Sequence, residues 1–359
     1  MAYKVAVLPG DGIGEEVMEQ ALRVLQAVAK RAGKVFETEL GFVGGAGWER
    51  FGKHFPDETR ALCERSDAIL FGSVGGPVAE MHLPKWKGCE TNSILAIRKA
   101  FEFHANFRPV KVFAGMEELC PLREEILAKG VDMLFVRELL GDIYFGEHKT
   151  ETVGGKRRAK DVAEYNEDQI AAVAHVAFKA ARRRRNKVTS VDKANVLDTS
   201  KLWRQVVREI GEQSYPDVQL EDILVDNCAM QIIRDPSAFD VVLTPNLFGD
   251  ILSDAGAVLP GSLGLLASAS FNDRGFAMYE PPGGSAPDIA GKGIANPIAQ
   301  ILSVALMLRY SFEMETEAAS IERSVEATLS AGFRTADILK PGGTRVNSAE
   351  MTDQILQRL

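Results

Sequence analysis

Short apolar runs alternate with longer amphipathic segments along the first part of the chain, and this alternation constrains the fold more than any other feature. The apolar runs span residues 5–8, 35–40 and 68–71, and the amphipathic segments between them span residues 15–31 and 57–66. A short apolar run between turn residues is typical of a buried strand, and a longer segment with helical periodicity is typical of a helix packed on a sheet. The alternation therefore predicts an α/β fold.

The size and charge of the chain limit its class. A length of 359 residues gives one large domain or two ordinary ones, and a net charge of −8 disfavours nucleic acid and acidic membrane surfaces as partners. The four cysteines are widely scattered without metal-ligand spacing, which suits a reducing cytoplasm. The N-terminus shows no signal peptide, and the longest uncharged stretch, residues 255–272, is interrupted by proline and glycine. We expect a cytoplasmic protein without a membrane span.

Two aspartates, Asp250 and Asp254, stand out in the segment that follows the apolar run 239–244. A helix beginning at about Leu247 would place both on one face, because positions i and i+4 are neighbours on a helix. Residues 235–273 contain no lysine or arginine, so the neighbouring sequence cannot neutralise this pair. Mg²⁺ or Mn²⁺ would do so, since these ions prefer carboxylate oxygens. Taken alone, the motif also fits a solvated acidic face.

Arginines at the ends of predicted elements are candidates for binding an anionic substrate. Arg98 lies in a predicted helix at residues 93–103, Arg108 lies in the strand-like segment after it, and Arg137 closes an apolar run. The planar guanidinium matches a carboxylate, so three of them suit a multiply anionic substrate, although each alone is more often a surface residue. Tyr144 follows in a glycine-bracketed turn.

Two further polar residues follow predicted strands. Lys193 ends the segment 188–193, and Asp226 follows another apolar run. A lysine at a strand end can act as a base when burial lowers its pKa. Ligands of α/β sheets gather at the carboxyl ends of strands, so Asp226 is a candidate third carboxylate near Asp250 and Asp254.

Three loops are rich in glycine. The turn at residues 10–14 reads GxGxG rather than the Rossmann spacing GxGxxG, so it is weak evidence for a nucleotide site. The loop at residues 72–77 either approaches a ligand or merely connects elements. The loop at residues 280–297 encloses Asp288, which could accept both hydroxyls of an adenosine ribose and would repel a 2′-phosphate.

Two basic stretches need separate interpretation. Residues 147–164 are hydrophilic and lack helical periodicity, which predicts a flexible excursion or an arm that pairs with a second subunit. The predicted helix 167–185 ends in four arginines. Cations at a helix C-terminus are favoured by the helix dipole, so this run does not indicate nucleic-acid binding.

Six motifs, in order, resemble those of the β-decarboxylating dehydrogenases of the isocitrate/isopropylmalate dehydrogenase type. They are Phe71-Gly-Ser-Val-Gly-Gly-Pro77, Arg98 with Asn106-Phe-Arg-Pro109, Arg137-Glu138 with Ile143-Tyr-Phe-Gly146, Val191-Asp-Lys-Ala-Asn-Val196, Asn246-Leu-Phe-Gly-Asp-Ile-Leu-Ser-Asp254 and Gly284-Ser-Ala-Pro-Asp-Ile-Ala-Gly-Lys292. The resemblance covers nearly the whole chain. Where the sequence departs from the pattern, as at Leu140 where a threonine is common, no proposed catalytic group is affected.

The resemblance implies an α/β fold with an open mixed sheet flanked by helices, in two domains and not of the Rossmann type. The first, cofactor-side domain would comprise residues 1–103 and 261–359. The second, residues 104–260, would carry a dimerisation arm and interface. The resemblance also implies a homodimer whose active sites are shared between subunits.

The resemblance further assigns roles to individual residues. Arg98, Arg108 and Arg137 would bind substrate carboxylates, and Asp250 and Asp254 would ligate Mg²⁺ or Mn²⁺ with Asp226 of the other subunit, which would also lie against the substrate. Lys193, again from the other subunit, would take the proton of the C2 hydroxyl, and Tyr144 would protonate the enol. NAD would contact Gly76, Glu90, Gly284, Ser285, Ala286, Asp288, Ile289 and Asn296.

The substrate expected from the resemblance is (2R,3S)-3-isopropylmalate, which would be oxidatively decarboxylated in leucine biosynthesis. Ile94 lies one helical turn before Arg98, so it could line an apolar pocket for the isopropyl group. Isocitrate, homoisocitrate, tartrate and D-malate are alternative substrates within the family, and isocitrate enzymes offer a serine where this chain has apolar residues. A non-catalytic regulatory subunit is a further alternative, disfavoured because the catalytic residue types are all present.

Overall fold

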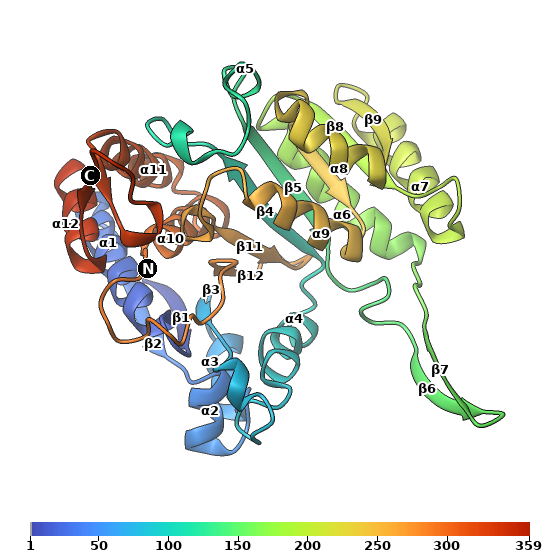
Figure 1. Ribbon diagram of the computed structural model, residues 1–359, viewed down its shortest axis with the longest axis horizontal. Coiled ribbons are helices and arrows are strands. Elements are labelled where there is room, and N and C mark those ends of the chain that lie inside the picture. Colours follow the sequence, from blue (N-terminus) through green and yellow to red (C-terminus); the bar gives the residue numbers. More distant parts are fainter. Residues whose placement is uncertain (1) are drawn as a thin grey trace. The chain divides into compact units, whose positions relative to one another are not determined.

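The computed structural model describes residues 2–359, which form two compact units (Figure 1). The first comprises the chain up to Phe101, Val112–Pro121 and Pro260–Leu359, and the second comprises Glu102–Lys111 and Leu122–Leu259. Each unit contains a mostly parallel set of strands with helices packed against it, which confirms the predicted α/β class. No helix within residues 2–359 is long and apolar enough to cross a membrane.

The strands of the first unit run in the order β2–β1–β3–β12–β11. Their bounds are β2 Phe36–Leu40, β1 Tyr3–Gly10, β3 Ala68–Ser73, β12 Ala277–Glu280 and β11 Ser268–Phe271. All neighbouring pairs are parallel except β12 and β11. β3 and β12 are buried along their whole lengths, so their near-continuous apolar runs reflect central positions.

The helices of the first unit cover these strands. They are α1 Gly14–Ala32, α2 Gly44–Phe51, α3 Asp57–Glu64, α4 Ala96–Ala100, α10 Ile298–Ser311, α11 Glu315–Ser330 and α12 Ser348–Arg358, with a small pair of strands, β13 Phe333–Arg334 and β14 Thr344–Arg345. α10 is buried over residues 298–308 because it packs against β3 and β12 on one side and against α1 and α11 on others. This explains why α10 is apolar on all sides.

The strands of the second unit run in the order β4–β5–β10–β8–β9. Their bounds are β4 Ala105–Lys111, β5 Asp132–Glu138, β10 Val241–Thr244, β8 Lys187–Asp192 and β9 Gln219–Leu224. β4 and β5 are antiparallel and the remaining pairs are parallel. The parallel strands therefore end at one edge of the sheet, and the segments that follow them meet there.

Helices lie on both faces of the second unit's strands, with α8 and α9 on the side towards the viewer in Figure 1. The helices are α5 Glu124–Leu127, α6 Glu167–Arg182, α7 Asp198–Ser214, α8 Val225–Arg234 and α9 Asn246–Ala257. β10 is completely buried between them. The unit also carries a two-stranded hairpin, β6 His148–Val153 and β7 Lys156–Asp161, which extends away from the helices of its own unit (Figure 1).

Three predicted elements differ from those observed. The helix expected at residues 93–103 is a π-helical turn, Thr91–Leu95, followed by α4. The hydrophilic stretch 147–164, predicted as a flexible excursion or an arm, contains the hairpin β6–β7, and its pairing with a second subunit stays a prediction. The helix expected to reach residue 185 ends at Arg182, because the arginines after it turn to pair within the unit: Arg184 donates to Asp240 at 2.8 Å and to Asp132 at 2.7 Å.

Candidate active site

Five of the predicted site residues meet on the face of the second unit that α9 covers. Asp250 and Asp254 lie one turn apart on α9. Arg137, at the end of β5, donates to Oδ1 of Asp250, and the Tyr144 hydroxyl donates to Oδ2 of Asp250 at 2.8 Å. Arg108, on β4, donates from Nη1 to Asp254 at 2.7 Å, and its Nη2 lies 3.6 Å from Asp250. Two arginines distant in sequence thus neutralise the acidic pair.

These contacts keep the site charged. Burial raises the pKa of Asp250, but Arg137, Tyr144 and Arg108 outweigh burial and hold it below its usual value. The pKa of Tyr144 is raised above its usual value by burial and by Asp250. Asp250 therefore remains a carboxylate and Tyr144 remains a protonated phenol near neutral pH. Two carboxylates on one helix face are a donor set that could hold a divalent cation, so the metal site stays a prediction.

The start of α9 is shaped to bring these groups together. A Cβ on Gly249 would lie 2.2 Å from Oγ1 of Thr244 and 2.7 Å from Cγ of Arg137, so only glycine allows the helix to approach the strand end this closely. Oδ1 of Asn246 accepts from Nε and Nη2 of Arg137 at 3.0 and 2.8 Å. Asn246 was not among the predicted site residues, although its place after a proline at a helix start is a signal that could have found it.

Lys193 and Asp226 form a separate pair in the second unit. They follow β8 and β9, which are parallel neighbours, so both lie at the same edge of the sheet. Nζ of Lys193 lies 2.8 Å from Oδ1 of Asp226, and this hydrogen bond is the main reason why the pKa of Asp226 is lowered. Within residues 2–359 of one chain, no three His, Cys, Asp or Glu side chains gather at metal-binding range. One chain therefore does not bring Asp226 to Asp250 and Asp254.

Arg98 lies in α4 of the first unit and is almost completely buried. Its Nη2 donates to Oε1 of the buried Glu280 at 3.1 Å, whereas its Nε has no hydrogen-bond partner in the described part of the chain. Ile94 is half-buried one turn earlier. The neighbouring Ser93 is fully buried and donates to the carbonyl of Cys89, so its hydroxyl is already engaged.

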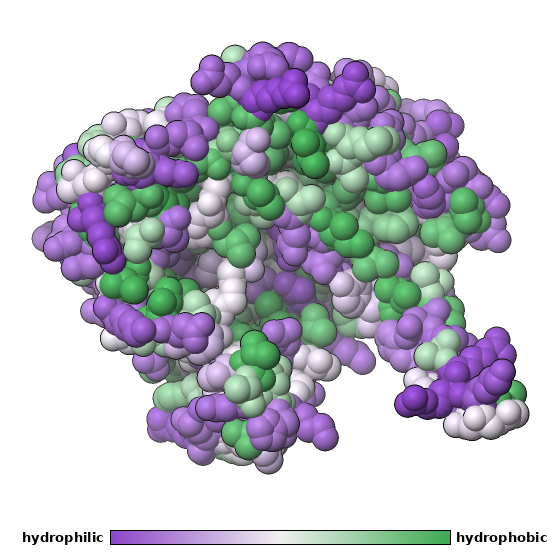
Figure 2. Space-filling view, in the orientation of Figure 1, coloured by the Kyte–Doolittle hydropathy of each residue, from purple (hydrophilic) through white to green (hydrophobic). Residues whose placement is uncertain are grey.

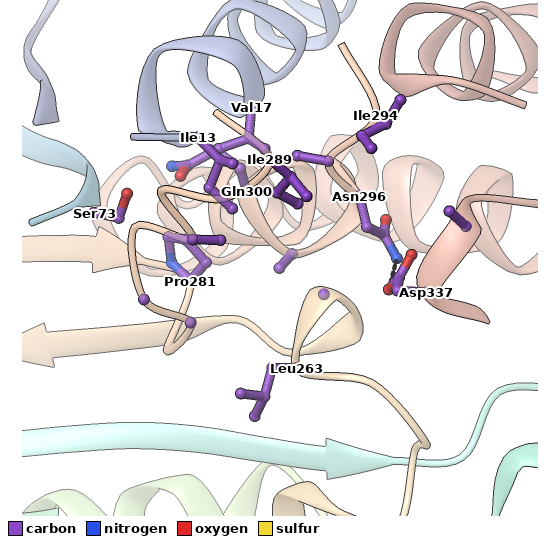
Figure 3. Close-up of a pocket in the computed structure, with 17 residues that line it drawn as sticks. Ile13, Val17, Ser73, Leu263, Pro281, Ile289, Ile294, Asn296, Gln300 and Asp337 are labelled. Carbon is purple, nitrogen blue, oxygen red and sulfur yellow. Dashed lines mark hydrogen bonds between the residues drawn. The ribbon is translucent and has the colours of Figure 1, made fainter. Parts of the chain in front are cut away.

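A cavity of about 470 Å³ lies in the first unit, between the start of α1, the loop after β12 and α10 (Figure 3). Its volume falls in the range of small-molecule sites, which is on the order of 300 to 1,000 Å³. Of the predicted cofactor residues, Gly284, Ala286, Ile289 and Asn296 line it. The cavity is mainly apolar, with Asn296 bonded to Asp337 at 3.1 Å at one end, which fits a nucleoside with a few polar anchors.

The other predicted cofactor residues lie outside the wall of this cavity. Gly76 packs on Trp86, where a Cβ would lie 2.2 Å from the ring. Glu90 and Asp288 are exposed, and Ser285 is buried with its carbonyl accepting from the N–H of Ile13 at 2.8 Å. Sequence reasoning missed several wall residues, notably Ile13, Leu263 and Asp337. The signal for Ile13 was present in the GxGxG turn.

Exposed apolar side chains collect on α8 and α9. Met230 and Ile233 on α8 are 60% and 56% exposed, and Ile251 on α9 and Val258 just after it are 59% and 58% exposed. Figure 2 shows hydrophobic surface over these helices. We call these four residues the α8–α9 apolar face.

Comparison with known proteins gives a consistent result. The family model for isocitrate/isopropylmalate dehydrogenase matches residues 4–355. The chain is 53% identical over 355 residues to a 3-isopropylmalate dehydrogenase of Pectobacterium atrosepticum, covering 99% of this chain and 97% of that protein. It is 52% identical over 354 residues to the 3-isopropylmalate dehydrogenase of Escherichia coli K12, covering 98% and 97%. Among solved structures, the isocitrate dehydrogenase of Methylococcus capsulatus matches with a TM-score of 0.87 at 34% identity, covering 99% of each chain.

Proposed function

The chain belongs to the isocitrate/isopropylmalate dehydrogenase family, and on that premise we propose that it oxidatively decarboxylates (2R,3S)-3-isopropylmalate to 4-methyl-2-oxopentanoate and CO₂ in leucine biosynthesis, using NAD. The observation that carries the proposal is the group formed by Arg108, Arg137, Tyr144, Asp250 and Asp254, in a chain more than half identical to 3-isopropylmalate dehydrogenases. The scattered free cysteines suit the cytoplasm as the place of this reaction.

The polar groups of the second unit suit the steps of this reaction. We assign Arg108 and Arg137 to the substrate carboxylates, because a guanidinium matches a carboxylate in shape and charge. Asp250 and Asp254 would hold Mg²⁺ or Mn²⁺, which when bound supplies Lewis-acid stabilisation of the negative charge that develops on oxygen. Arg98, in the first unit, is proposed as a third substrate-binding arginine on the strength of its buried, unpartnered Nε.

Proton transfers would fall to Lys193 and Tyr144. Lys193 would accept the proton of the C2 hydroxyl as the hydride leaves C2 for the nicotinamide ring. The carboxylate β to the new 2-oxo group then leaves as CO₂, and its bonding electrons form the enolate. Tyr144 would deliver a proton to C3, and its raised pKa keeps the hydroxyl protonated for that step.

We propose that the enzyme is a homodimer in which Lys193 and Asp226 act at the partner's Asp250 and Asp254. Two observations support this. Lys193 and Asp226 bond to each other rather than to the acidic pair of their own chain. The α8–α9 apolar face adjoins both pairs in sequence, and contiguous exposed apolar surface of this kind marks interaction sites.

NAD is proposed as the cofactor of the cavity in the first unit. The exposed carboxylate of Asp288 would favour a ribose hydroxyl and oppose a 2′-phosphate. One base, Lys292, lies in the same loop, but its Nζ donates to the backbone carbonyl of Asp288 at 2.7 Å. We expect kcat/KM for NAD to exceed that for NADP by about one to two orders of magnitude.

The second candidate substrate is isocitrate, on which a structural relative acts by its name. It would bring a third carboxylate to the region of Ile94, and the Ser93 hydroxyl that could meet it is bonded to the carbonyl of Cys89. A desolvated carboxylate without a partner is strongly disfavoured. We therefore place isocitrate below 3-isopropylmalate.

The test is formation of NADH from NAD, or of NADPH from NADP, with 3-isopropylmalate, D-malate and isocitrate as substrates, each with and without Mn²⁺. We expect turnover of 3-isopropylmalate that requires the metal and prefers NAD. Turnover of isocitrate or D-malate with a kcat/KM equal to that of 3-isopropylmalate would overturn the substrate assignment. Absence of turnover on all three would favour the regulatory-subunit alternative.

A further inference from the structure

A buried carboxylate that takes no part in the proposed chemistry lies directly behind the site. Glu138 follows Arg137 at the end of β5 and has no solvent-accessible surface. It accepts three hydrogen bonds: from the N–H of Leu140 at 2.5 Å, from the N–H of Gly141 at 2.8 Å and from the hydroxyl of Tyr165 at 3.0 Å. A buried polar group is tolerated when it is hydrogen-bonded, so three donors aimed at one buried carboxyl group are a built arrangement.

The Tyr165 hydroxyl links this carboxylate to α9. Its oxygen accepts from the backbone N–H of Asn246, the first residue of the helix, at 2.9 Å. That N–H has no partner within the helix, because the first turn of any helix leaves its donors unsatisfied. Tyr165 is nine-tenths buried, so water does not offer an equivalent acceptor. The hydroxyl therefore anchors the N-terminus of α9 to the end of β5.

Asn246 connects Tyr165 to Arg137, the proposed substrate-binding arginine. Its side-chain oxygen accepts from two nitrogens of Arg137, at 3.0 and 2.8 Å, and its Nδ2 donates to the carbonyl of Gly141 at 3.1 Å. The hydrogen bonds thus run from Glu138 through Tyr165 and Asn246 to Arg137, and the peptide bond between Arg137 and Glu138 closes the circuit. Arg137 in turn donates to Asp250.

The donors around Glu138 set the direction of the circuit. Every group that hydrogen-bonds to its carboxylate is a donor, so Tyr165 must donate towards Glu138 and is left with lone pairs for Asn246. Burial, followed by the charge of Glu138, raises the pKa of Tyr165 well above its usual value, so the hydroxyl keeps its proton. A phenylalanine at position 165 would fill the same space but would lack the hydroxyl, so the hydrogen bonds with Glu138 and Asn246 would both be lost.

We propose that Glu138 and Tyr165 are positioning residues that fix the guanidinium of Arg137 and the first turn of α9, and thereby set the geometry in which the enzyme binds its substrate carboxylate. Neither side chain has a hydrogen bond to Asp250 or Asp254, so both act through Asn246 and Arg137. The role of Arg137 in this statement rests on the proposed function. The circuit itself rests on the contacts alone.

The test compares Tyr165→Phe with a matched control, Tyr279→Phe. Tyr279 is fully buried on β12 of the first unit, and its hydroxyl bonds to Oγ of Ser311 at 2.7 Å, so both variants lose one buried hydroxyl. We expect Tyr165→Phe to raise KM for 3-isopropylmalate roughly tenfold while kcat changes by less than about threefold, the pattern of weakened substrate binding. Tyr279→Phe should lower Tm about as much as Tyr165→Phe does, but it should leave KM for 3-isopropylmalate unchanged.

Two further measurements distinguish a positioning role of Tyr165 from a general loss of stability. Glu138→Gln, if it folds, should raise KM in the same direction, because an amide cannot accept from all three donors. Amide hydrogen exchange at Asn246 and Leu247, which needs no substrate, should accelerate in Tyr165→Phe and not in Tyr279→Phe. An unchanged KM and unchanged exchange in Tyr165→Phe, or an equal rise of KM in both tyrosine variants, would overturn the proposal. If amide exchange differs between the two variants as expected but the wild type does not turn over 3-isopropylmalate, the proposed function is refuted and the circuit is retained.

Discussion

Asp250 is the residue on which the polar contacts of the second unit converge. It receives hydrogen bonds from Arg137 and Tyr144 and lies near Arg108, and the balance of burial against these contacts keeps it ionised. A carboxylate that is held ionised and only half-buried is well prepared to exchange an arginine partner for a metal ion.

Asp250→Asn should therefore lower kcat and raise the Mn²⁺ concentration needed for activity, because the neutral amide holds a divalent cation poorly. The measurement is kcat as a function of Mn²⁺ concentration. Asp57→Asn is the control, since Asp57 is an exposed aspartate of the first unit that pairs only at the surface with Lys53 at 2.6 Å. Full activity of the wild type in excess EDTA would refute the metal assignment.

Ile94 offers a second prediction at this scale. Burial of an isopropyl group against it would contribute roughly 1.5 to 3 kcal/mol, which corresponds to about 10 to 200-fold in kcat/KM over a substrate that lacks the group. Ile94→Ser should narrow the preference for 3-isopropylmalate over D-malate, whereas Ile94→Val should largely retain it. Equal preferences in Ile94→Ser and the wild type would show that the isopropyl group binds elsewhere.

Glu138 makes stability depend on pH. Burial raises its pKa from 4.5 to about 7 despite the hydrogen bonds of Leu140, Gly141 and Tyr165. Between these two values the folded protein holds a proton that the unfolded chain releases, so the stabilisation is greatest below pH 4.5 and is lost as pH rises through about 7. The free energy of unfolding of the wild type relative to Glu138→Gln should fall across this window, by at most about 1.4 kcal/mol per pH unit. Urea unfolding at several pH values measures it, and a constant difference would contradict the raised pKa.

At the scale of the elements, the sequence pattern predicted the strands and helices whose burial follows from their own residues. The apolar runs that became β3 and β10 are buried throughout, and α9 begins at Asn246, one residue before the expected start. The hairpin β6–β7 was not predicted as strands, because all but one of its residues are exposed and no alternation of apolar and polar residues marks its faces. The run of arginines at the end of α6 was attributed to the helix dipole, whereas Arg182, Arg184 and Arg185 form ion pairs with Asp217, Asp132 and Asp240.

The site residues divide in the same way, into those found from local spacing and those whose contacts depend on the tertiary structure. Asp250 and Asp254 could be found because their spacing is local, whereas the arginines that pair with them depend on strand register. β4 and β5 are antiparallel with Asn106 opposite Arg137, so Arg108, two residues along, lies on the same face as Arg137. Nothing local to either strand contains that information. Glu138 and Asn246 were missed for a related reason, since a polar residue at the end of an element is usually solvated.

The α8–α9 apolar face leads to a prediction about assembly. Ile233→Glu and Val258→Glu should each weaken the proposed homodimer, because a charge placed in a buried apolar contact is desolvated without a partner. Val35→Glu is a matched control, since Val35 of the first unit is 59% exposed, against 56% and 58% for the other two. Sedimentation equilibrium measures the outcome. Dimers of unchanged stability in both variants would exclude this face as the interface.

At the scale of the whole molecule, the chain distributes its candidate groups over two units. The cavity and Arg98 belong to the first, while the acidic pair and the pair formed by Lys193 and Asp226 belong to the second. The proposed sharing would bring Asp226 of one chain to the acidic pair of another, which residues 2–359 of a single chain do not bring together. The proposed sharing can be tested without knowledge of the interface.

Mixing Lys193→Ala with Asp250→Ala should regenerate activity, although each variant alone should be inactive. A mixed dimer has one site with both lesions and one with neither, so random pairing would restore about one quarter of wild-type activity. Mass spectrometry of the mixture establishes that subunits have exchanged. Exchange without any recovered activity would mean that each site is built from a single chain.

The ion pair between Arg137 and Asp250 has a thermodynamic consequence. In the proposed reaction its two members are intended for different ligands, the substrate carboxylate and the metal ion, and the pair must separate before either can bind. Binding of the first ligand carries the free-energy cost of separating the ion pair. The second ligand then binds a residue whose ion pair is already broken. By linkage, each ligand then raises the affinity of the other by the same factor. The unliganded protein would thus bind either one alone weakly and the two together strongly, a cooperativity that arises within one site from two arrangements of a single ion pair.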